Sequence, residues 1–156
     1  MPTGSDDVFQ GEGDGALNLI VSGLKLVDKW QFAGAVGAEI PFSHEQSTNS
    51  FVSGHVSYEV CKWFTPLVEL NWFHVWDAGD SGPFGVSPIV QFEGNDFFNL
   101  GAANAHENRD LVTAAVGFRS RILDNVDVGA AYEIPLTEEE DSLFDQRVTV
   151  DLIWKF

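Results

Sequence analysis

The stretch Arg147-Val148-Thr149-Val150-Asp151-Leu152-Ile153-Trp154-Lys155-Phe156 decides the fold, because apolar and polar residues alternate along most of it. Successive side chains of a β-strand point to opposite faces of a sheet. The stretch therefore predicts a strand with one apolar and one polar face, and only Ile153 departs from the pattern. The apolar face comprises Val148, Val150, Leu152, Trp154 and Phe156.

Six earlier segments alternate in the same way, so we expect about seven strands in all. In the first segment the alternation changes phase around Gly23, which predicts a β-bulge there. A run at 86–92 could be an eighth strand, but Pro88 interrupts it and we interpret it as part of a loop. The six segments are 17–27, 30–40, 53–60, 68–72, 112–122 and 126–134.

The connections between these segments alternate in length. Short ones at 27–30, 61–66 and 123–126 separate long polar stretches at 42–50, 77–110 and 136–146. Six of the eight basic residues also lie near the short connections, whereas acidic residues crowd the long ones. Short turns on one side and long loops on the other are typical of an antiparallel up-and-down transmembrane β-barrel. We therefore expect that fold class, as a single domain covering residues 1–156.

Composition excludes several other classes of protein. The chain has 8 basic and 24 acidic residues, a balance that excludes a nucleic-acid binder. No apolar run approaches the roughly 18 residues that a membrane helix needs. The single cysteine, Cys61, cannot form an intrachain disulfide. Residues 1–7 lack the basic and apolar regions of a signal peptide.

An internal repeat bears on strand number. Glu39-Ile40-Pro41 and Glu133-Ile134-Pro135 each end a strand that leaves a tight turn, and residues 1–4 look like the end of a third copy. The repeat predicts that the chain lacks N-terminal strands of a larger barrel, because such barrels close with an even number of strands.

Aromatic residues gather near strand ends, as in the two aromatic girdles of a membrane barrel. We expect Trp30, Trp63, Phe64, Trp154 and Phe156 near the turns, and Phe42, Phe51, Trp72, Trp76 and Tyr132 toward the loops.

The polar face supplies the candidate site, the lining of a lumen. Acids on the earlier strands and arginines on a later strand would create a field across that lumen. Two alternatives stay open: an open pore, or a small plugged barrel in which these groups pair with one another. The candidates for lumen lining are Glu39, His55, Glu59, Glu69, Arg119, Arg121, Asp127, Glu133 and Asp151.

Catalytic, metal and cofactor sites are not expected. None of the four histidines lies beside a serine in a recognisable motif, and no metal-ligand spacing occurs. The acidic run at 138–141 is a solvated loop tip or, alternatively, a place where divalent cations bridge to lipopolysaccharide.

The last strand, with its terminal Phe156, resembles the C-terminal strand of Gram-negative outer-membrane β-barrels. That resemblance implies that Trp154 and Phe156 form a signal read by the barrel-assembly machinery. Together with the repeated Glu-Ile-Pro, the segment 7–15 and the segment 96–101, the ending is similar to outer-membrane transporters of the phenol-degradation-pathway type.

The resemblance implies a porin-like channel or transporter in the bacterial outer membrane, in contact with lipid and lipopolysaccharide. The solutes would be small molecules, hydrophobic or aromatic ones among them. Two alternatives remain: a small structural or adhesive barrel with acidic external loops, and a soluble lipocalin-like ligand carrier.

Overall fold

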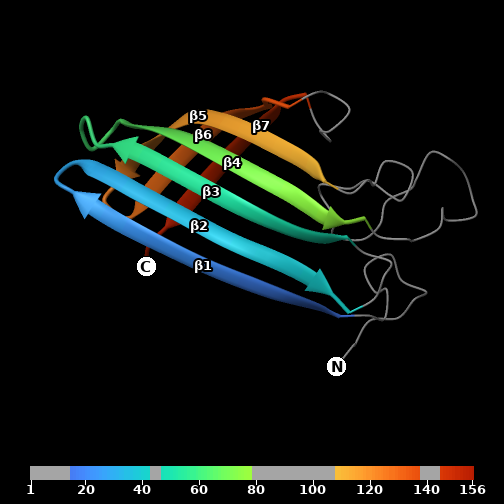
Figure 1. Ribbon diagram of the computed structural model, residues 1–156. Helices are drawn as coiled ribbons and strands as arrows, with labels where there is room; N and C mark the ends of the chain where they lie inside the picture. Colours follow the sequence, from blue (N-terminus) through green and yellow to red (C-terminus); the bar gives the residue numbers. More distant parts are fainter. Residues whose placement is uncertain (1–14, 43–46, 79–107, 138–144) are drawn as a thin grey trace, which may run out of the picture.

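The computed structural model describes residues 15–42, 47–78, 108–137 and 145–156. They form one antiparallel sheet of seven strands, each hydrogen-bonded to the next in chain order (Figure 1). The predicted all-β, up-and-down arrangement is therefore confirmed. The candidate eighth strand at 86–92, the segments 1–14 and 96–101, and the acidic run at 138–141 lie outside the described residues. The strands are β1 (Ala16–Val27), β2 (Trp30–Pro41), β3 (Thr48–Tyr58), β4 (Thr65–Asp77), β5 (Arg109–Leu123), β6 (Val126–Pro135) and β7 (Arg147–Trp154).

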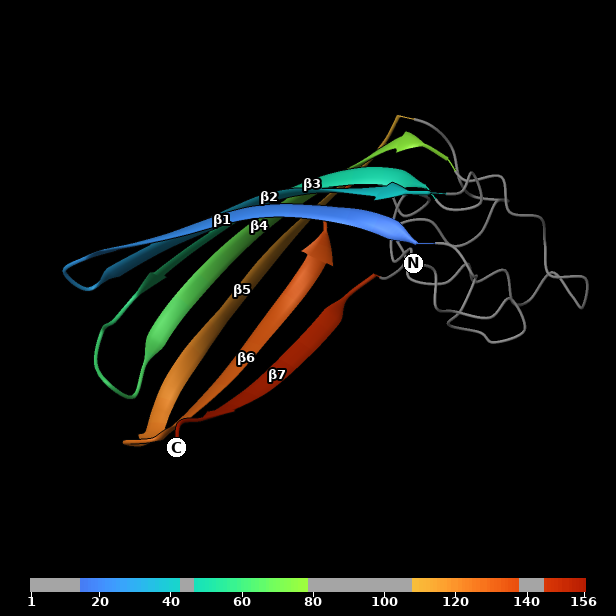
Figure 2. The same ribbon diagram turned by 90° about the horizontal axis from the view of Figure 1, so that it is seen from below.

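The three short connections lie at one end of the sheet, called the turn end below, together with Phe156 (Figure 2). Asp28 and Lys29 join β1 to β2, and Asp28 has a positive φ of 51°, a conformation that aspartate tolerates better than most residues. Asp124 and Asn125 join β5 to β6. The other three connections lie at the opposite end, the loop end. The predicted sorting by length holds only in part, because the loop-end connection 42–47 and the turn-end connection 59–64 are both six residues long.

β1 and β7 are the two edges of the described sheet, and they do not pair with each other. Because neighbouring strands alternate in direction, strands one and seven both run from the loop end to the turn end. The described strands therefore form a curved, open sheet rather than a closed barrel (Figure 2).

The two faces of this sheet differ in chemistry. On the outer, convex face, apolar side chains such as Val21, Val116 and Val150 are 72%, 58% and 71% exposed. On the inner, concave face, polar and small side chains predominate and are less exposed, so that β2 alternates between exposed and half-buried residues. Cross-strand pairing keeps these faces in phase from β2 to β7.

The predicted bulge at Gly23 is wrong. β1 and β2 pair without interruption from Ala16↔Pro41 to Val27↔Trp30, and Gly23 lies opposite Gly34. What looks like a change of phase in the sequence is instead a strand with apolar residues on both faces, since Ile20, Leu24 and Leu26 fall on the inner one. Irregular pairing occurs near Thr48/Asn49 and Arg121/Leu123.

The most buried apolar side chains lie on the inner face toward the loop end, where Val75 and Leu111 are almost fully covered. Phe51, which we expected in an outer aromatic band, belongs to this inner cluster, with its ring centroid 6.2 Å from that of Phe73. Phe51 faces inward because the odd-numbered residues of β3 all lie on the inner face. Its ring lies over Gly37, where a Cβ would overlap it.

No helix in the described part of the chain is long and apolar enough to cross a membrane.

Candidate functional site on the inner face

Strand alternation places eight of the nine predicted lining residues on the inner face. Glu59 is the exception, because β3 ends at Tyr58 and Glu59 lies exposed in the connection at the turn end. The other eight are Glu39 on β2, His55 on β3, Glu69 on β4, Arg119 and Arg121 on β5, Asp127 and Glu133 on β6, and Asp151 on β7.

Near the turn end, the inner face of β5–β7 carries a cluster of ion pairs. Oδ1 of Asp127 lies 3.2 Å from Nε of Arg121, and Oδ2 lies 2.6 Å from Nζ of Lys155. The Asp127 carboxylate is buried between these two cations. Two charged donors offset the free-energy cost of burying this carboxylate. Removal of both donors would leave a buried charge without compensation.

Arg119 and Asp151 pair across an intervening strand. Nη2 of Arg119 lies 3.0 and 3.2 Å from the two carboxylate oxygens of Asp151, although β6 separates β5 from β7. Gly129 of β6 lies between them in the register, and a Cβ there would overlap the Asp151 carboxylate. The missing side chain at Gly129 therefore makes this contact possible.

A second network crosses the sheet toward the loop end. The Thr113 hydroxyl donates to Glu133 at 2.6 Å, and the Asn71 amide donates to Thr113 at 3.3 Å. Nε of Arg147 donates to the other Glu133 oxygen at 2.9 Å. Glu133 and Thr113 are buried. Sequence reasoning did not single out Asn71, Thr113 or Arg147, although all three are polar residues on inward-facing positions.

On β3 and β4, His55 connects an acid to a hydroxyl. Nδ1 of His55 lies 2.7 Å from Oε1 of Glu69, and Nε2 lies 3.1 Å from the Ser57 hydroxyl oxygen. Because a carboxylate only accepts, Nδ1 carries a proton, and in the neutral imidazole Nε2 then accepts from the Ser57 hydroxyl. The order resembles a Ser-His-acid catalytic triad. Ser57, however, is only 6% exposed, and it does not line the neighbouring hollow, so the geometry fits a role of His55 in holding Glu69 in place.

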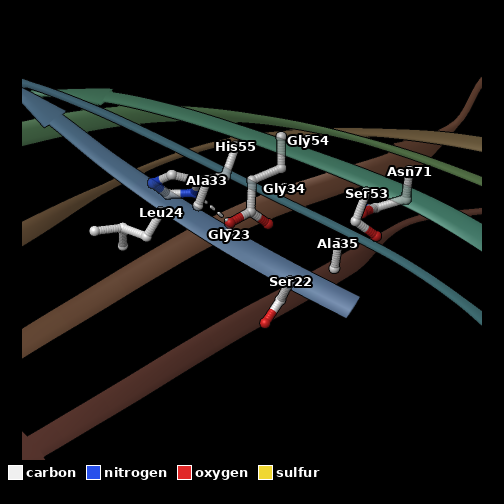
Figure 3. Close-up of a pocket in the computed structure, with 11 residues that line it drawn as sticks. Ser22, Gly23, Leu24, Ala33, Gly34, Ala35, Ser53, Gly54, His55 and Asn71 are labelled. Carbon is white, nitrogen blue, oxygen red and sulfur yellow. Dashed lines mark hydrogen bonds and ion pairs between the residues drawn. The ribbon is translucent and has the colours of Figure 1, made fainter. Parts of the chain in front are cut away.

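A hollow of about 620 Å³ opens on the inner face beside this pair. Figure 3 shows that Leu24, Ala33, Ala35 and Ser53 line it from the first three strands, and that the dashed contact begins at His55. Ala33, Ala35 and Ser53 have small side chains, and Leu24 adds an apolar one. Glu69 supplies the only formally charged group among the lining residues when histidine is counted as neutral.

Charge is divided between the two halves of the inner face. The inner face of β1–β4 carries Glu39 and Glu69 and, among its described residues, no lysine or arginine. The inner face of β5–β7 carries more basic than acidic residues. Its three acids, Asp127, Glu133 and Asp151, each pair with a cation. Acids of the earlier strands and arginines of a later strand thus lie on opposite halves of the inner face, while the ion pairs neutralise part of the charge. The basic residues are Arg109, Arg119, Arg121, Arg147 and, just beyond β7, Lys155.

The outer face carries exposed aromatic rings toward its two ends. At the loop end, the Trp72 indole donates to Asp110 at 2.7 Å, and His74 lies 2.9 Å from the same Asp110 oxygen. The Trp76 indole donates to Ser50 at 2.9 Å. At the turn end, Trp30, Trp63, Phe64, Trp154 and Phe156 are exposed.

Among the described residues, no three His, Cys, Asp or Glu side chains gather closely enough to hold a metal ion. Two of the four histidines, His44 and His106, lie outside the described part of the chain.

No protein-family model, no curated protein and no solved structure matches the chain. Function is therefore argued from the chemistry of the two faces.

Proposed function

We propose that these strands form part of the wall of a bacterial outer-membrane β-barrel that acts as a passive channel or transporter for small molecules. One observation carries the proposal: the curved sheet is apolar and exposed on its convex face, and polar and charged on its concave face. Such a wall has a surface suited to lipid outside and to water inside.

The apolar outer face is too large to be an ordinary water-exposed surface. It extends over all seven strands, whereas soluble monomers rarely expose apolar patches above a few hundred Å². Most of the strands, at 10 to 15 residues, also reach the roughly 9–11 residues that a tilted membrane strand needs. The sidedness argues against a lipocalin-like carrier, which would keep its apolar side chains inside.

Strand direction supports a larger barrel. Because β1 and β7 run the same way, an antiparallel barrel could close only through an odd number of further strands between them. Seven strands plus an odd number give an even total, as single-chain bacterial barrels have.

A second candidate function is a structural or adhesive barrel with a closed interior. The observation in its favour is the inner face of β5–β7, where long side chains pair with one another and fill space. The inner face of β1–β4 favours the channel instead, because its small side chains leave the hollow beside His55.

Planar-bilayer recording distinguishes the two. The full-length protein, refolded in detergent and added to a bilayer, should give stepwise increases in conductance. Absence of steps, in protein whose heat-modifiable gel mobility shows that the barrel is folded, would refute the channel and favour the structural barrel. A folded protein that stays in the aqueous phase without detergent would refute both.

A further inference from the structure

We infer that the hollow on the inner face of β1–β4 is a binding site for small organic cations that have an apolar body. The inference rests on the proposed function, because it takes the inner face to be a water-filled lumen, and it adds a class of solute to it. The proposed channel rests mainly on the contrast between the two faces of the sheet, whereas the binding site rests on this hollow. Experiments can therefore refute the binding site without refuting the channel.

Shape is the first argument. The volume of about 620 Å³ falls in the range of roughly 300–1,000 Å³ that is usual for small-molecule sites. Small side chains create the space, because Ala33 and Ala35 on β2 and Ser53 on β3 all face inward. Figure 3 shows Leu24 and Ala33 together on one side of the hollow, and Ser53 with Asn71 on another.

Charge is the second argument. Oε1 of Glu69 accepts from His55, while Oε2 has no hydrogen-bond partner among the described residues. The Glu69 side chain is 39% exposed, so this free oxygen is open to a ligand. Because His55 is itself held by Ser57, the carboxylate is oriented before a ligand arrives. An oriented carboxylate binds a charged donor such as a primary ammonium more strongly than a neutral donor.

The surrounding charges favour the same class of ligand. The inner face of β1–β4 has no described lysine or arginine that would compete for Glu69, and Glu39 lies on the same side of the lumen. An anion would be repelled here and drawn to the opposite half. The apolar groups of Leu24, Ala33 and Ala35 would cover the body of the ligand, which a bare metal cation lacks.

The test uses benzylamine as the probe, with benzyl alcohol and benzoate as its neutral and anionic counterparts. In bilayer recordings of the full-length protein, benzylamine should block the current at lower concentration than either counterpart. Glu69→Gln keeps the shape of the side chain and removes its charge. It should raise the half-blocking concentration of benzylamine at least about tenfold, because hydrogen bonds to charged groups contribute more than neutral ones.

Three further variants separate the effect of charge from the effect of space. Ala35→Leu should fill the hollow and weaken benzylamine block with every charge retained, whereas Val36→Leu, on the outer face of the same strand, should leave it unchanged. Glu59→Gln removes the same charge at the turn end, away from the hollow, and should match the wild type. Heat-modifiable gel mobility establishes that each variant is folded.

Calorimetric titration of the folded protein with benzylamine in detergent distinguishes the two proposals. If the protein conducts and Glu69→Gln does not change its affinity for benzylamine, the inference is overturned and the proposed channel is not. Binding that depends on Glu69 in a protein without conductance supports the site and refutes the channel. Absence of binding in the wild-type protein overturns the inference, whatever the conductance.

Discussion

The sharpest test of the membrane orientation is a single arginine placed at different depths on β5. Val116 is the central residue of the 15-residue strand Arg109–Leu123, and its side chain is 58% exposed on the outer face. Its cross-strand neighbours there are Val68 and Tyr132, and neither carries a negative charge. If lipid covers this face, Val116→Arg puts a charge near the bilayer midplane, at a cost of about 2–4 kcal/mol.

Ile122, near the turn end of the same strand, is the control for depth. Six residues at about 3.4 Å each put it roughly 20 Å from Val116 along the strand. With a strand tilt of about 40°, the separation along the membrane normal is roughly 15 Å, which exceeds half of an apolar band about 25 Å tall. Ile122→Arg should therefore cost no more than about 1 kcal/mol.

Thr149 is the control for sidedness, because it faces inward and is exposed. Thr149→Arg should have a small effect, since the new side chain would enter water if the inner face lines the proposed lumen. The assay is equilibrium refolding of the full-length protein into lipid vesicles against denaturant concentration, which gives the free energy of unfolding of each variant. Equal costs at Val116 and Ile122, or a cost at Thr149 as large as that at Val116, would refute the membrane orientation.

Three further predictions concern assembly, selectivity and chemistry. Phe156→Ser should lower the amount of protein in the outer membrane, because the exposed terminal ring completes the apolar face of the last strand; unchanged levels in membrane fractions would contradict this. Replacing both Arg119 and Arg121 with Ser should shift the reversal potential in a salt gradient toward cation preference. The reason is that the change removes two positive charges from the inner face and leaves their acidic partners. An unchanged reversal potential in a conducting protein would exclude these arginines from the ion path. Ser57 should not react with a fluorophosphonate probe, because its hydroxyl is buried beside His55; labelling that Ser57→Ala abolishes would instead indicate a nucleophilic serine.

Several features of the fold could be predicted from the sequence because they depend on neighbouring residues alone. A period of two residues is a local property, so the order of apolar and polar residues assigned β2 and β7 to strands with two different faces. Turn chemistry such as Asp124-Asn125 is equally local, and it located the tight connections. The same alternation put eight of the nine candidate lining residues on the inner face.

The errors came where local pattern was ambiguous. In β1 both faces carry apolar residues, so a continuous strand looked like one with a bulge at Gly23. Phe51 was assigned to an outer band by its position near a strand end, but its place in the alternation turns it inward over Gly37. Glu59 continued the alternation of β3 for one residue beyond the point where the strand ends.

The sequence by itself determined which side chains share a face, because that follows from strand geometry. Only the tertiary structure decided which of them meet, because the register between strands sets those distances. Arg119 reaches Asp151, 32 residues away, only because a glycine lies between them on β6. Likewise, Glu69 meets His55 only when β3 and β4 pair in the observed register, and the hollow beside them exists only once the small residues of β1, β2 and β3 are aligned.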